Sequence, residues 1–187
     1  MPALQSGVDC ARERACPLPA LLPGVEGREV KRKDLYMGTT AIDPLKTIGQ
    51  IHAYLVRMGA QRIMNTYENG EAVAVHFMLA IGGTEMSFEL PARIDPIFKI
   101  INKDRPWGHS KQADLDQAKR VAWRQIYRWI QAQVALIETG MAEAAEVFMP
   151  YMQVADAAGQ PTTLYRRAIS GGMGQLALTT GEAVKRG

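Results

Sequence analysis

ADLDQAKRVAWRQIYRWIQAQVALIET, residues 113–139, decides the fold, because it predicts one long helix with two chemically different faces. Arg120, Arg124 and Arg128 stand four residues apart on one face, which places their guanidinium groups roughly 6 Å apart along the helix. Such a ladder suits a row of phosphates or carboxylates, and a solvated surface is the alternative. The opposite face predicts the core side of the helix, with apolar residues at helical spacing: Leu115, Ala118, Ala122, Ile126, Trp129, Ile130 and Ile137.

The residues before this helix predict a first helix and a β-meander. The helix begins at Asp43–Pro44, or at the capping box from Thr47 to Gln50, and ends at Gly59. Three alternating runs follow it, QRIMNTYE, EAVAVHFMLA and TEMSFELP, separated by Asn69–Gly70 and Gly82–Gly83. Asn-Gly between two alternating runs is a strong hairpin signal, so these runs predict an antiparallel sheet.

The remaining elements complete a single α+β domain over residues 42–154. A short helix is predicted after Asp95–Pro96, and another after Gly140 that stops at Pro150. The expected architecture is a three-stranded antiparallel β-meander packed against three to four helices, including the long arginine-bearing helix.

Both ends of the chain lack periodic apolar patterns. Residues 1–41 predict an unstructured extension, and residues 155–187, rich in glycine and small residues, predict a flexible tail. The codons for Lys33 and Asp34 can form a purine-rich ribosome-binding sequence shortly before Met37. We therefore hypothesise that the natural protein starts at Met37 and that the preceding residues are not native.

Composition narrows the class of protein. No segment reaches the roughly 18 uninterrupted apolar residues of a membrane span, and the N-terminus has no secretory layout, which favours a cytoplasmic protein without a membrane partner. Cys10 and Cys16 are accordingly interpreted as free thiols. Residues 37–154 hold 12 basic and 12 acidic side chains, so only a local patch can attract a polyanion.

No catalytic or metal-binding motif is recognisable. His52, His76 and His109 have no second ligand at metal-binding spacing, and neither a nucleophile elbow nor a phosphate loop is present. Acidic pairs such as Asp114 and Asp116 are interpreted as favourable charges near a helix start. The sequence therefore predicts a protein that is not an enzyme and uses no metal or cofactor.

One loop stands out beside the arginine ladder. Between Lys103 and Lys111 it places Trp107 between Pro106 and Gly108, with Arg105 nearby. An exposed tryptophan among cations can stack on unpaired bases or anchor a protein interface. The alternative is a tryptophan folded back over the edge of the core.

Three stretches of the chain together resemble a group of small bacteriophage and prophage proteins of uncharacterised function. They are VAWRQIYRWIQAQVALIETGM (residues 121–141), EVFMPYM (146–152) and SFELP (87–91). The likeness covers roughly residues 47–151. It implies a phage or prophage origin and supports Met37 as the start, and it carries over no activity and no site residue.

The predicted function is that of a non-enzymatic phage accessory protein that binds nucleic acid, single- or double-stranded, or the DNA-processing machinery. The alternative is a protein-binding inhibitor or adaptor that acts on a host enzyme, such as a defence enzyme. The sequence leaves the oligomeric state open. The residues expected to carry the binding are Arg105, Trp107, Lys111, Arg120, Arg124 and Arg128.

Overall fold

Helix α1 (Pro44–Arg57) begins at the Asp43–Pro44 step, the first of the two starts considered from the sequence. The Asp43 carboxylate accepts hydrogen bonds from the backbone N–H groups of Leu45, at 2.8 Å, and Lys46, at 3.4 Å. Gly59, just after the helix, has a φ of 90°, which glycine adopts without strain. This computed structural model describes residues 30–103, 105–108 and 110–170.

The three predicted strands form an antiparallel sheet in the order β1 (Arg62–Glu68), β2 (Glu71–Ile81), β3 (Thr84–Pro91). Asn69 and Gly70, with φ values of 51° and 80°, form the first turn, where both central residues need a left-handed backbone. In the middle of the sheet Phe77 lies opposite Ile63 on one side and Phe88 on the other. The α+β class and the meander are confirmed.

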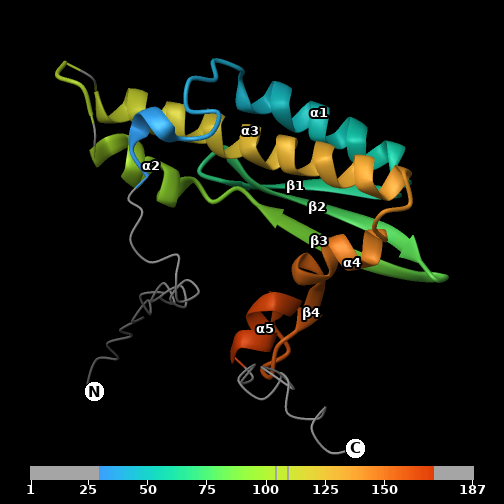
Figure 1. Cartoon of the computed structure of the whole chain (residues 1–187). Coiled ribbons are helices and arrows are strands. Elements are labelled where there is room, and N and C mark those ends of the chain that lie inside the picture. The colour runs from blue at the N-terminus through green and yellow to red at the C-terminus, as the bar shows by residue number, and fades with distance from the viewer. Residues whose placement is uncertain (1–29, 104, 109, 171–187) are drawn as a thin grey trace, which may run out of the picture.

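The main core lies between the sheet and the two helices α1 and α3 (Lys111–Glu138), which run side by side over one face of the sheet (Figure 1). Phe77 and Phe88 stack with ring centroids 5.3 Å apart, and Phe148 meets Phe77 edge-on at 5.3 Å. Buried aliphatic residues of both helices and the sheet fill the rest: Ile48, Ile51, Leu55, Val75, Leu79, Leu90, Ile130 and Val134.

Helix α3 is buried along two stripes, whereas the sequence analysis expected one. Its first half packs on α2 (Ile94–Lys103), with Val121 against Ile97 and Ile101 in a second apolar cluster. From Trp123 onward it packs on α1 and the sheet, through Trp123, Tyr127, Ile130 and Val134. The predicted stripe missed Trp123 and Tyr127, because a helix packed from two sides has no single apolar face.

Residues 30–41 do not match the expected unstructured extension. Arg32–Asp34 form a turn of 3-10 helix, η1, and the following residues run along α3. The Gln117 side-chain amide donates to the carbonyl oxygens of Gly38, at 2.8 Å, and Thr40, at 3.0 Å. Leu35 also packs against the α2–α3 cluster. These contacts are made by polar and isolated apolar residues, which leave no periodic pattern.

The residues after α3 form a small unit below the sheet (Figure 1). Phe148 and Met152 attach it to the core, and Met152 makes an isolated bridge to Phe88. The flexible tail predicted from residue 155 is therefore wrong up to Ser170, since strands of three residues are too short to show alternation. The unit contains α4 (Ala144–Phe148), η2 (Met149–Tyr151), β4 (Gln153–Ala155), β5 (Pro161–Thr163) and α5 (Leu164–Ser170).

Three sequence predictions concern residues outside the described ranges: the thiols Cys10 and Cys16, residues 1–29 of the extension, and the tail beyond Ser170. Within the described ranges, every helix falls short of the length or the apolar character that a membrane crossing requires.

Candidate nucleic-acid interface at the start of α3

The start of α3 is fixed by Ser110, whose hydroxyl accepts a hydrogen bond from the backbone N–H of Ala113 at 3.0 Å. One turn later comes Asp114, whose side chain is fully buried. A buried carboxylate is expensive to desolvate unless cations and hydrogen bonds surround it. The groups that neutralise the Asp114 carboxylate therefore determine how the segments around the start of α3 are held together.

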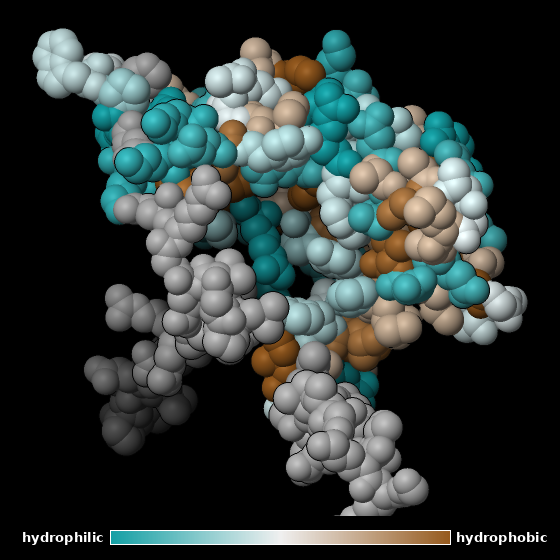
Figure 2. All heavy atoms as spheres, viewed as in Figure 1, coloured by the Kyte–Doolittle hydropathy of each residue, from teal (hydrophilic) through white to brown (hydrophobic). Residues whose placement is uncertain are grey.

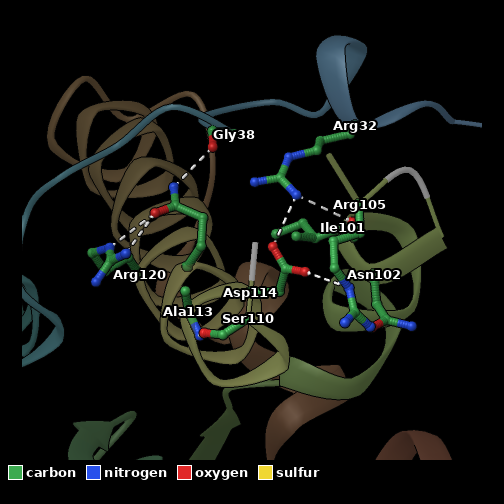
Figure 3. Close-up of polar contacts among 10 residues, drawn as sticks. Arg32, Gly38, Ile101, Asn102, Arg105, Ser110, Ala113, Asp114 and Arg120 are labelled. Carbon is green, nitrogen blue, oxygen red and sulfur yellow. Dashed lines mark hydrogen bonds and ion pairs between the residues drawn. The ribbon is translucent and has the colours of Figure 1, made fainter. Parts of the chain in front are cut away.

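Two arginines from different segments converge on Asp114 (Figure 3). Nη1 of Arg32 lies 2.9 Å from Oδ1, and Nε of Arg105 lies 3.2 Å from Oδ2. Arg32 also donates to the carbonyl oxygen of Ile101 at 3.3 Å. Asp114 thus joins the N-terminal segment, the end of α2 and the loop between α2 and α3 at one point.

This junction brings two cationic runs of the sequence together. Arg32 belongs to the run Lys31–Lys33, which the sequence analysis placed in an unstructured extension, and it now lies beside the loop that carries Trp107. Residues 31–34 and 102–116 hold six Lys/Arg side chains and four Asp side chains. The resulting local excess of positive charge contrasts with the neutral balance of residues 37–154.

Trp107 lies at the tip of this loop with a relative exposure of 102%. This exposure excludes one alternative left open by the sequence, a tryptophan folded back over the edge of the core. Neighbouring Gly108 has a φ of 86°, so the chain turns sharply there. Lys111 is exposed at the start of α3, while Arg105 points back to Asp114.

The arginine ladder is not a uniform surface. Arg124 is only 7% exposed, contrary to its predicted place on an open ladder. Its Nη1 donates to Oε1 of Gln50 at 2.6 Å, and its guanidinium lies 4.3 Å from the ring centroid of Tyr127. Helix α1 covers this position, so Arg124 serves the packing between α1 and α3.

The other two ladder residues remain accessible and have only neutral hydrogen-bond partners. Arg120 donates to Oε1 of Gln117 at 2.7 and 3.0 Å, and Arg128 donates to Oε1 of Gln131 at 2.8 Å. Within the described part of the chain, no carboxylate pairs with any ladder arginine. Their charges are therefore available to an external anion.

The six residues predicted to bind do not form one site. Trp107, Lys111 and the inward-pointing Arg105 lie at the start of α3. Arg120 lies nine residues beyond Lys111, and Arg128 lies 17 beyond it, which corresponds to roughly 14 Å and 25 Å along the helix axis. We define the loop end as residues 31–34, 105–108 and 110–111, and the ladder as Arg120 and Arg128.

A second polar cluster lies on the side of α3 that faces the β1–β2 turn. Nζ of Lys119 lies 2.9 Å from Oε1 of Glu71 and 3.5 Å from Oδ1 of Asp116, beside a pocket of about 320 Å³. Burial alone would lower the pKa of Lys119, but the hydrogen bond and charge of Glu71, and then those of Asp116, outweigh it and raise the pKa.

Comparison with protein-family models, with curated proteins and with solved structures finds no match to this chain. Within the described ranges, no three His, Cys, Asp or Glu side chains are grouped so that they could hold a metal ion. The geometry of the loop end, the ladder and the surfaces around them is therefore what indicates a function.

Arg32 and Asp114 are not among the site residues predicted from the sequence. Asp114 was interpreted as a favourable charge in the first turn of a helix, a role that does not require burial. One signal was available, since Asp114 is followed by Leu115 and Ala118 on the expected apolar side of the helix. Its partner Arg32 lies 82 positions away, too far for any local pattern to reveal.

Proposed function

We propose that the protein is a non-enzymatic phage or prophage accessory protein that binds single-stranded nucleic acid at the loop end. The fully exposed side chain of Trp107, within a cationic surface, is the observation that carries this proposal. Proteins that bind single strands combine aromatic rings, on which bases stack, with cations that neutralise phosphates. Trp107 offers the ring, and Lys111 offers a cation that is present even if the protein starts at Met37. Lys31 and Lys33 add two more cations when the residues before Met37 are translated.

The ladder supports the same proposal in a second way. The side chains of Arg120 and Arg128 donate hydrogen bonds only to glutamine side chains, so an incoming phosphate would displace no ion pair. A strand that leaves the loop end at Lys111 and follows α3 would meet Arg120 after roughly 14 Å and Arg128 after roughly 25 Å. Short strands would therefore use the loop end alone, and longer strands would also reach the ladder.

A phage or prophage origin and a cytoplasmic location belong to this proposal. The resemblance of residues 121–141 and 146–152 to small phage proteins supports the origin. The cytoplasm is where phage nucleic acid is copied and processed, so a protein that binds it would act there.

Fluorescence anisotropy with labelled oligo(dT) at low salt tests the proposal. The wild type should bind at micromolar protein, and Trp107→Ala should weaken binding roughly 5- to 150-fold, which corresponds to about 1–3 kcal/mol for one stacked base. Tyr67→Ala is the matched control, because Tyr67 is also an exposed aromatic residue but lies on β1. Equal loss in both variants, or no binding by the wild type, would contradict the proposal.

The same assay examines the ladder with the double variant Arg120→Gln/Arg128→Gln. Each phosphate contact contributes about 0.7 to the slope of log affinity against log salt for single strands. A 30-nucleotide strand should lose roughly 1.4 from its slope. A three-nucleotide strand spans only roughly 7 Å at about 3.4 Å per phosphate, so it cannot reach from Lys111 to Arg120 and should lose nothing. Arg124 stays unchanged in this variant because it is buried against α1.

A protein-binding inhibitor or adaptor is the second candidate function. An exposed tryptophan also anchors protein interfaces. A groove that is separate from the loop end and the ladder gives a more specific reason to expect a protein partner.

A further inference from the structure

A groove of about 820 Å³ lies between α3 and the small C-terminal unit. Figure 2 shows the front of the molecule hollowed in this region, above the C-terminal unit. Its volume falls within the range of about 300–1,000 Å³ that is typical of ligand sites. None of the residues of the loop end or the ladder lines it, so it is a separate surface.

Aliphatic side chains from three helices line part of the groove. They are Ile97 of α2, Ala122 and Ile126 of α3, and Val147 of α4. Trp129 and Tyr151 also line the groove, but each is already packed on a neighbour, with Trp129 edge-on to Phe148 at 5.6 Å and tilted against Tyr151 at 5.4 Å. Tyr165 of α5 also lines the groove and is 41% exposed. The groove therefore offers one open aromatic ring beside a larger aliphatic area, which suits the aliphatic side chains of a peptide.

Two guanidinium groups give the groove its charge. Arg93, just after β3, and Arg166, on α5, are both exposed and lie on its wall. Within the described part of the chain, neither side chain makes an ion pair or a hydrogen bond. The one carboxylate of the lining, Glu89, accepts a hydrogen bond from the Gln153 side chain. The groove therefore complements an anion that also carries apolar groups.

We infer that this groove binds a short peptide segment of a partner protein, in which carboxylates alternate with aliphatic side chains. Arg93 and Arg166 hold the carboxylates, since a guanidinium fork matches a carboxylate in two hydrogen bonds. The aliphatic side chains of the peptide pack on Ile126 and Val147, which are only half-buried. This site is independent of the nucleic-acid proposal, because it shares no residue with the loop end or the ladder.

Fluorescein-labelled decapeptides of alternating leucine and glutamate test this inference by anisotropy with the full chain. A matched peptide carries glutamine in place of glutamate, and another carries lysine. The glutamate peptide should bind, and the other two should bind at least tenfold more weakly. The variant Arg93→Gln/Arg166→Gln should also weaken the glutamate peptide at least tenfold. The control Arg62→Gln, an exposed arginine on β1, should leave binding unchanged.

Methyl NMR locates the peptide. The signals of Ile126 and Val147 should shift on addition of the glutamate peptide, and the signal of buried Val75 should not. Absence of binding at 1 mM peptide, equal binding of the glutamine or lysine peptide, or shifts outside the groove would overturn the inference. So would shifts of the groove methyl groups on addition of oligo(dT), which would assign the groove to nucleic acid.

The two proposals fail separately. Trp107→Ala should leave peptide binding unchanged, and Arg93→Gln/Arg166→Gln should leave oligo(dT) binding unchanged. A loss of peptide binding in Trp107→Ala would contradict the separation of the two sites.

Discussion

The substitution Asp114→Ala most directly tests whether the ion pairs of Asp114 with Arg32 and Arg105 stabilise the loop end. Removing one partner of a fully buried ion pair costs about 3–5 kcal/mol, because the remaining charge stays buried. Here the side chains of Arg32 and Arg105 are 26% and 34% exposed, so both guanidinium groups can turn partly to water. We therefore expect a smaller loss of about 2 kcal/mol in the free energy of unfolding.

Thermal unfolding followed by circular dichroism measures this loss. A domain of this size changes its Tm by roughly 3–4 °C for each 1 kcal/mol, so Asp114→Ala should lower Tm by roughly 6–8 °C. Asp116→Ala is the control, because its side chain is 44% exposed and its pair with Lys119 is worth about 0.5 kcal/mol or less. A double-mutant cycle of Arg32→Ala with Asp114→Ala should show a coupling of about 1 kcal/mol. An unchanged Tm in Asp114→Ala would refute the reasoning.

Three further predictions concern stability. Removal of residues 1–36 should lower the free energy of unfolding in urea by about 2 kcal/mol, because it removes Arg32, a partner of Asp114, and the apolar contact of Leu35. An unchanged urea midpoint would mean that these contacts contribute nothing to stability. Ile130→Asp should prevent folding at 37 °C by burying an unpaired charge, whereas Ala132→Asp, at an exposed position of the same helix, should fold normally by circular dichroism. The raised pKa of Lys119 means that its contribution to stability is complete below pH 10.5 and is lost as pH rises through the raised pKa. An NMR titration should show a lower pKa of Lys119 in the variant Glu71→Gln. An unchanged pKa in that variant would exclude the ion pair with Glu71 as the cause of the shift.

The sequence correctly predicts those helices and strands whose formation depends on residues that are close together in the chain. The Asn69–Gly70 turn, the cap at Asp43 and the alternation along β2 each act within a few residues, so the sequence predicts the meander and α1 well. The long helix was also predicted within two residues at its start, with Lys111 observed against Ala113. Element order then determined the α+β class.

Long-range packing explains what the sequence did not predict. The buried state of Arg124 depends on Gln50, which is 74 positions away on α1, and no helical periodicity in α3 can report it. Arg32 was assigned to an unstructured segment, because a charged run gives no apolar pattern even when one of its members binds a buried carboxylate. The groove beside α5 is not predicted from the sequence, since its walls come from residues spread between Glu89 and Arg166.

Fluorine NMR of the protein labelled with 5-fluorotryptophan tests the central claim most directly. The chain has three tryptophans, and each lies in a different place: Trp107 at the loop end, Trp123 in the core and Trp129 in the groove. Addition of an unlabelled eight-nucleotide oligo(dT) at low salt should shift and broaden the Trp107 signal and leave the other two in place. An unchanged Trp107 signal at saturating oligonucleotide, or a shift confined to Trp129, would contradict single-stranded nucleic-acid binding at the loop end.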